Sequence, residues 1–127
     1  MSVHARGSAQ TGAKGIVSGF LSNGATWVET FELSENEAEI SGADTSTWKL
    51  VFKNCDSGSP VLTLTSGSEI TVTQNTTSTL FAISCPQSSL DALEGDYSVD
   101  FASQAAGGTI THWLSGIVTI IDEDLGF

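Results

Sequence analysis

The sequence predicts an all-β protein, an immunoglobulin-like antiparallel β-sandwich of about eight strands with one short helix. Apolar and polar residues alternate with a period of two in several short segments, which is the pattern of half-buried strands. Clusters of Gly, Asn, Asp and Ser separate these segments at short intervals, as turns do in a sandwich. The 127 residues fit one domain, and six Phe and three Trp are enough for one core. A small closed barrel or jelly roll is the alternative architecture.

The strands are expected where the alternation is regular. Residues 47–53 give the clearest case, because Trp48, Leu50 and Phe52 fall on one face. Residues 96–102 repeat the pattern, with an aromatic or branched side chain at every second position. The remaining strands are expected at residues 16–21, 27–33, 61–65, 69–73, 79–85 and 109–121.

Three segments depart from this regularity. Residues 34–44 are acidic and are expected to form a loop. Residues 87–93 follow a proline and resemble one or two helical turns, with Ser88 or Ser89 as the N-cap. Gly116 lies inside the last expected strand and predicts a β-bulge there, because glycine in a strand often marks one.

Residues 1–15 are expected to be an N-terminal arm, separate from a sandwich domain that spans residues 16–127. The arm is small, polar and rich in glycine, and it carries Arg6 and Lys14. Such a segment cannot bury a core of its own, so we expect it either to hang free or to become ordered on a neighbouring subunit.

The charge balance excludes several classes of partner. Four Lys or Arg against fifteen Asp or Glu give a net charge of −11, which repels nucleic acid and anionic membrane surfaces. Solubility is the ordinary interpretation of so many carboxylates. Calcium binding is the alternative, with oxygen ligands from Asp122, Glu123 and Asp124 and a further one from Asp44 or Asp56.

The two cysteines and the first residues of the chain bear on the cellular compartment of the protein. Cys55 and Cys85 lack the spacing of a zinc site, and synthesis in the cytosol would leave them as thiols. A disulfide between the two cysteines, formed after release from the cell, is the alternative. The first residues lack the apolar core of a secretory signal, and no apolar run is long enough to span a membrane.

The sequence contains few residues in an arrangement that could form a catalytic site. His112 would need a serine and an aspartate on neighbouring strands to form a catalytic triad, and His4 lies in the arm. Asp96 and Asp100 are the candidate carboxylate pair for glycoside hydrolysis, but their spacing fits a solvated sheet face better. We therefore expect no enzyme activity, no catalytic residue, no cofactor and no metal.

The three tryptophans leave a carbohydrate-binding module open as a third function class. They are Trp27, Trp48 and Trp113. At least Trp48 is better explained as part of the core, given the alternation around it.

The order of features from Trp27 to Asp124 resembles a family of phage proteins. The segments that carry the resemblance are Trp27–Leu33, Ile40–Ala43, Trp48–Lys53, Val61–Ile70, Leu90–Asp100, Gly108–Ile110 and Leu114–Ile120. They are similar in order and spacing to the N-terminal domain of the upper baseplate protein of lactococcal siphophages and to related short prophage proteins. The resemblance implies a non-enzymatic virion part with an architectural motif and no inherited site residues.

The expected function is therefore that of a tail, baseplate or fibre-adaptor component, assembled in the host cytoplasm. A capsid cement or decoration protein, attached to the major capsid protein shell, is the alternative. The expected partners are other virion proteins, together with further copies of this chain as a homo-oligomer. The expected contact elements are the arm, the acidic residues 35–39, and the apolar residues Val51 and Ile117.

Overall fold

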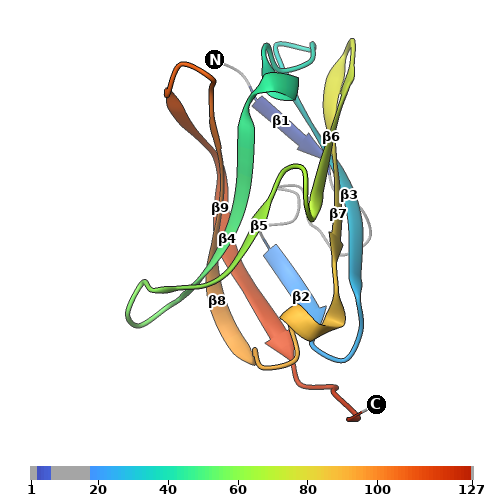
Figure 1. Cartoon of the computed structure of the whole chain (residues 1–127), viewed down its shortest axis with the longest axis vertical. Helices are drawn as coiled ribbons and strands as arrows, with labels where there is room; N and C mark the ends of the chain where they lie inside the picture. The colour runs from blue at the N-terminus through green and yellow to red at the C-terminus, as the bar shows by residue number, and fades with distance from the viewer. Residues whose placement is uncertain (1–2, 7–17, 127) are drawn as a thin grey trace.

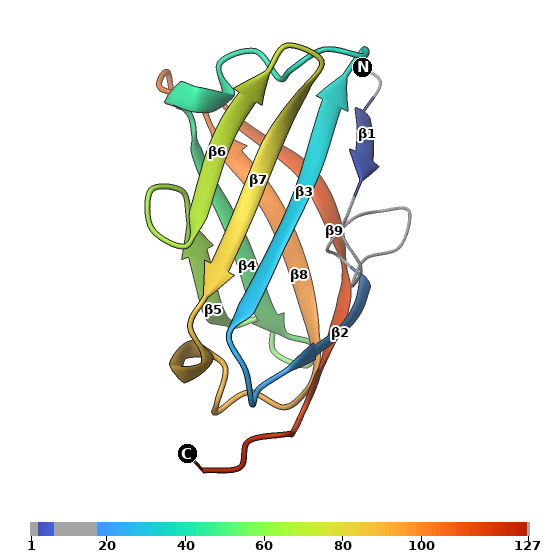
Figure 2. The same ribbon diagram turned by 90° about the vertical axis from the view of Figure 1, so that its right-hand side faces the viewer.

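The computed structural model of the chain describes residues 3–6 and 18–126, which form a two-layer β-sandwich (Figures 1 and 2). One sheet has the strand order β1-β3-β7-β6, and the other has the order β2-β9-β8-β4-β5. The first sheet contains β1 (Val3–Arg6), β3 (Trp27–Glu35), β7 (Ser78–Cys85) and β6 (Ile70–Asn75). The second contains β2 (Ser18–Ser22), β9 (Ile110–Ile121), β8 (Gly95–Gln104), β4 (Thr47–Asn54) and β5 (Pro60–Thr65). In Figure 2 the first sheet lies in front of the second.

The strand order confirms the predicted immunoglobulin-like sandwich. β1, β3, β7 and β6 take the places of strands A, B, E and D of such a domain, and β9, β8, β4 and β5 take those of G, F, C and C′. β2 is an additional edge strand beside β9, and this described pair is parallel. The other described pairs are antiparallel. Tyr97 near the start of β8 bonds the backbone of Glu94 at 3.1 Å, as the tyrosine corner of these domains does.

Aromatic side chains fill the space between the sheets. Trp48, Leu50 and Phe52 of β4 are all fully buried, as the alternation predicts. The Trp48 ring stacks on Phe101 of β8 at 5.1 Å, and Phe101 meets Phe31 of β3 edge to face at 5.3 Å. Antibody domains place a tryptophan and an inter-sheet disulfide in this region, whereas this chain joins the sheets there through aromatic contacts.

The helical segments differ from the prediction. Residues 87–93 form only a short 3-10 helix, η2 (Gln87–Ser89), followed by turns. Pro86 occupies its N-cap position, so neither predicted serine caps it. A second 3-10 helix, η1 (Ala43–Thr45), overlaps the end of the expected loop. The Trp48 indole N–H donates to the Ala43 carbonyl at 2.9 Å and holds this helix.

The predicted bulge in the last strand is in a different place. The register between β8 and β9 shifts so that Trp113 is the extra residue, whereas Gly116 pairs regularly with Val99. The Trp113 ring turns toward the core, where it lies 5.7 Å from the Trp48 ring. Packing of a large aromatic side chain, rather than the freedom of glycine, therefore accompanies the bulge.

The predicted arm lies only partly within the described residues. Val3–Arg6 form β1, which pairs with the far end of β3 in the register Val3 to Glu35 and Arg6 to Glu32. The rest of the predicted arm, residues 1–2 and 7–15, lies outside the described residues. The same holds for residues 16 and 17, the expected start of the next strand.

The C-terminal segment is tied to the turn between β2 and β3. The Asn23 side chain is buried and donates to the Leu93 carbonyl at 3.0 Å and to the Asp122 carboxylate at 3.2 Å. Its side-chain oxygen accepts the Glu123 N–H at 2.8 Å. A side chain at Gly24 would collide with the Glu123 carbonyl.

No helix among the described residues has the length and apolarity to cross a membrane.

Candidate functional site

The outer face of the second sheet carries a group of exposed apolar side chains. Along β9, Val118 and Ile120 point into the core, so Ile117 and Ile121 point outward. Phe20 of β2 pairs with Thr119 and therefore lies on the same outer face, between the two isoleucines. The exposed fractions of Phe20, Ile117 and Ile121 are 63%, 50% and 44%. We call these three residues the β2–β9 patch.

The charged residues at the outward strand positions of β4 and β8 are balanced. Lys49 and Lys53 of β4 and Asp96 and Asp100 of β8 occupy outward positions on this face, as the inward Phe52 and Phe101 require. Lys53 Nζ donates to Asp100 Oδ2 at 2.7 Å, and the Thr119 hydroxyl donates to Asp96 Oδ1 at 2.6 Å. The other thirteen of the fifteen carboxylate residues lie elsewhere in the chain.

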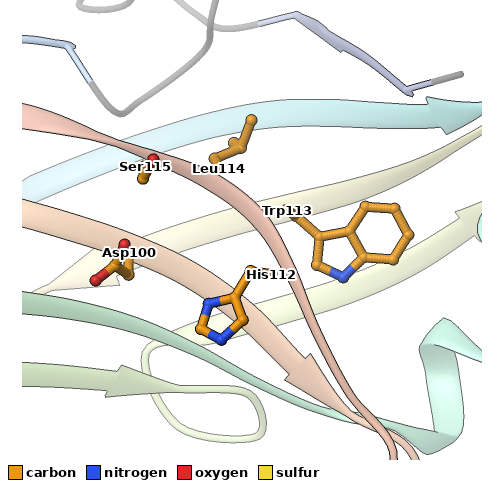
Figure 3. Close-up of a pocket in the computed structure, with 5 residues that line it drawn as sticks. All are labelled: Asp100, His112, Trp113, Leu114 and Ser115. Atoms are coloured by element: carbon orange, nitrogen blue, oxygen red, sulfur yellow. The ribbon is translucent and has the colours of Figure 1, made fainter.

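An open depression of about 320 Å³ lies on β8 and β9, further along β9 from the patch (Figure 3). Its lining consists of Asp100 from β8 and of His112, Trp113, Leu114 and Ser115 from β9. The bulge at Trp113 lies within this lining, and a bulge disturbs the regular pairing of a strand.

The structure thus brings a serine and an aspartate to the neighbourhood of His112. Figure 3 shows the three polar groups spread around the depression, without a contact drawn between any two of them. The Asp100 carboxylate is engaged by Lys53 at 2.7 Å. Among the described residues no hydrogen bond joins His112 to Ser115 or to Asp100, so the relay that a triad needs is not formed in this structure.

The other candidate ligand and substrate sites are dispersed. Asp44 lies in η1 at one end of the sandwich, whereas Asp122–Asp124 lie at the opposite end (Figure 1). Within residues 3–6 and 18–126, no three acidic, histidine or cysteine side chains are grouped so as to hold a metal ion. Trp27 and Trp48 are buried, and the half-buried Trp113 bonds Ser103 through its indole N–H at 3.0 Å. The tryptophans therefore form no exposed platform for a sugar.

Both cysteines are free thiols in different parts of the fold. Cys55 is exposed in the turn between β4 and β5, and Cys85 is buried at the end of β7. Burial raises the pKa of the Cys85 thiol from 9.0 to about 11, since the charged thiolate is poorly solvated there. Cys85 is therefore a core residue, and Cys55 is the thiol that solvent reaches.

The predicted contact elements have different outcomes. Ile117 is exposed, as expected, but Val51 is half-buried. The acidic residues 35–39 form a tight turn in which Asn36 and Glu37 both have positive φ, 54° and 64°. Glu35 and Ala38 exchange two backbone hydrogen bonds across it, at 2.9 and 3.1 Å.

The sequence does not predict the exposure of Phe20 and Ile121, two residues of the patch. Each stands next to a buried apolar neighbour, Leu21 and Ile120. In a run of adjacent apolar residues the alternation does not reveal which member faces the core. A signal exists only in the pairing of β2 with β9, which joins residues about a hundred positions apart.

No protein-family model matches the chain, and no curated protein sequence does either. Solved structures with a similar chain course include CopC from Methylosinus trichosporium OB3b, with 12% identity and a TM-score of 0.41 over 87% of this chain and 91% of that one. Another is AggA, the major subunit of aggregative adherence fimbriae type I from Escherichia coli, with 8% identity and a TM-score of 0.49 over 94% of each chain. Since identity and TM-score are both low, neither likeness bears on the function of this chain.

Proposed function

We propose that this chain is a non-enzymatic structural subunit of a bacteriophage particle, in the tail or baseplate, where it joins a larger tail structure to the receptor-binding apparatus. The observation that carries the structural role is the β2–β9 patch, which exposes three large apolar side chains on one sheet face. Contiguous exposed apolar surface is costly for a soluble monomer and is typical of a surface that another protein covers.

The rest of the surface supports the same role. Asp100 beside the depression is occupied by Lys53, and the tryptophans are packed into or against the core. A rigid sandwich with an apolar face is suited to holding neighbours in place. The phage assignment itself depends on the resemblance of Trp27–Asp124 to the baseplate family.

The experiment is quantitative mass spectrometry of purified phage particles produced by a strain that carries the gene. The proposal expects the protein in intact particles and in the tail fraction, at a copy number fixed relative to the other tail proteins. Recovery with tail-free capsids instead would support the capsid-decoration alternative. Absence from both fractions, when the protein is present in the lysate, would contradict the proposal.

A gene deletion complements the mass spectrometry. Deleting the gene is expected to yield particles that lack receptor-binding parts and do not infect, and expression of the intact chain in trans restores them. Particles that are complete and infectious without the protein would contradict the joining role.

A further inference from the structure

We propose that two copies of this chain associate face to face through the outer face of the second sheet, with the β2–β9 patch in the contact. The inference adds to the proposed function and does not depend on it, because it concerns the isolated chain. The partner it names is a second copy.

The first reason is the distribution of exposed apolar side chains. Three of the large exposed ones, Phe20, Ile117 and Ile121, lie together on one face of β2 and β9. On the strands of the first sheet that have described side chains, Val28 is the one large exposed hydrophobic residue. Burial of the patch removes apolar surface from water, whereas an isolated valine offers little.

The second reason is electrostatic. Two copies that each carry a net charge of −11 repel one another over most of their surfaces. The outer strand positions of the second sheet are an exception, because Lys49 and Lys53 balance Asp96 and Asp100 there. The strand positions of this face therefore add no net charge, so a second copy meets less repulsion over them than over the acidic rest of the surface.

The third reason is size. Five strands spaced about 4.8 Å apart give a face about 19 Å across, and the ten residues of β8 extend for about 33 Å. The resulting area of about 600 Å² per copy is somewhat below the typical value of about 800 Å² for a stable interface. We therefore expect a weak dimer, which repeated copies in an assembly would strengthen.

The salt dependence of the dissociation constant distinguishes an apolar contact from one that is held by ion pairs. Raising the salt concentration shortens the range of the repulsion between the two acidic copies and leaves apolar burial intact. The dimer is therefore expected to become tighter as NaCl rises from about 0.05 M to about 0.5 M. Association through simple ion pairs would weaken instead.

The test is sedimentation velocity of the full chain over a concentration series up to about 200 µM, where a micromolar dimer is populated. The wild type is expected to form dimers, and Ile117→Asp is expected to raise the dissociation constant at least about tenfold. Val28→Asp, an exposed valine on the opposite sheet, is the matched control and should leave it unchanged. Phe20→Ser is a second variant within the patch and should weaken the dimer as well.

Several results would overturn the inference. The wild type could stay monomeric at the highest protein and salt concentrations, or the Ile117→Asp variant could dimerise as tightly as the wild type. A third such result is a Val28→Asp variant whose dissociation constant rises as much as that of Ile117→Asp. An assembly larger than a dimer also overturns it, since two faces related by a two-fold axis close at two copies. Thermal melting checks that each variant is folded, and if Ile117→Asp is not, Phe20→Ser decides. A monomeric chain found in purified particles would reject the dimer and leave the proposed function standing.

Discussion

Replacing Asn23 with alanine is expected to destabilise the domain more than substitutions in an exposed turn usually do. The side chain is 2% exposed and makes three hydrogen bonds, to the Leu93 carbonyl, the Asp122 carboxylate and the Glu123 N–H. A net contribution of about 1 kcal/mol for each of the three bonds gives a loss of at least about 3 kcal/mol, since the Leu93 carbonyl and the Glu123 N–H also lose their side-chain partner. In a domain of this length that corresponds to a fall in Tm of roughly 10 °C.

Equilibrium urea denaturation followed by tryptophan fluorescence measures this loss. The matched control is Asn75→Ala, because Asn75 is an exposed turn-proximal residue whose side chain makes no hydrogen bond among the described residues. It should change the free energy of unfolding by less than about 0.5 kcal/mol. Equal midpoints and slopes for the two variants would refute the reasoning, since the C-terminal segment would then not be held by Asn23.

Three further predictions concern the turn, the buried thiol and the core. Glu37→Gly should stabilise the domain by about 0.5–1 kcal/mol in urea denaturation, because φ is 64° there, whereas Glu39→Gly should destabilise it; similar effects would contradict this. Folding raises the pKa of the Cys85 thiol from 9.0 to about 11, so between these values the unfolded chain loses the proton that the folded chain keeps. The free energy of unfolding is therefore unaffected below pH 9 and falls toward pH 11, by up to about 1.4 kcal/mol per pH unit. Urea titrations across this range should show that loss in the wild type and not in Cys85→Ala, and an equal decline in both would reject it. Phe101→Ala should cost about 3–5 kcal/mol by the same assay, and a loss below about 1 kcal/mol would mean that the aromatic cluster does not join the sheets.

Alternation predicts the strands that have one polar and one apolar face. At Trp48, Leu50 and Phe52 every second residue is apolar, so the element and its buried face both follow from the sequence. The turn at Asn36 and Glu37 is not visible in this way, because it uses positive φ without a glycine. The 3-10 helix η1 is not visible either, since it is held by a side-chain hydrogen bond from the Trp48 indole, which the alternation of apolar and polar residues does not show.

The surface that carries the proposed role was predicted only in part. Ile117 was expected to be exposed, and it is. Phe20 and Ile121 have buried apolar neighbours in sequence, so only the parallel pairing of β2 with β9 brings them together. That pairing, like the bond from Asn23 to Glu123, joins segments about a hundred residues apart, and no local pattern encodes it.

Cryo-electron microscopy of the purified phage tail, at a resolution that shows strands, tests the proposed function. If the chain is a tail component, the density of the tail or baseplate contains its two-sheet sandwich, with Phe20, Ile117 and Ile121 buried against a neighbouring chain. A well-resolved tail in which every density is filled by other proteins would rule out this role.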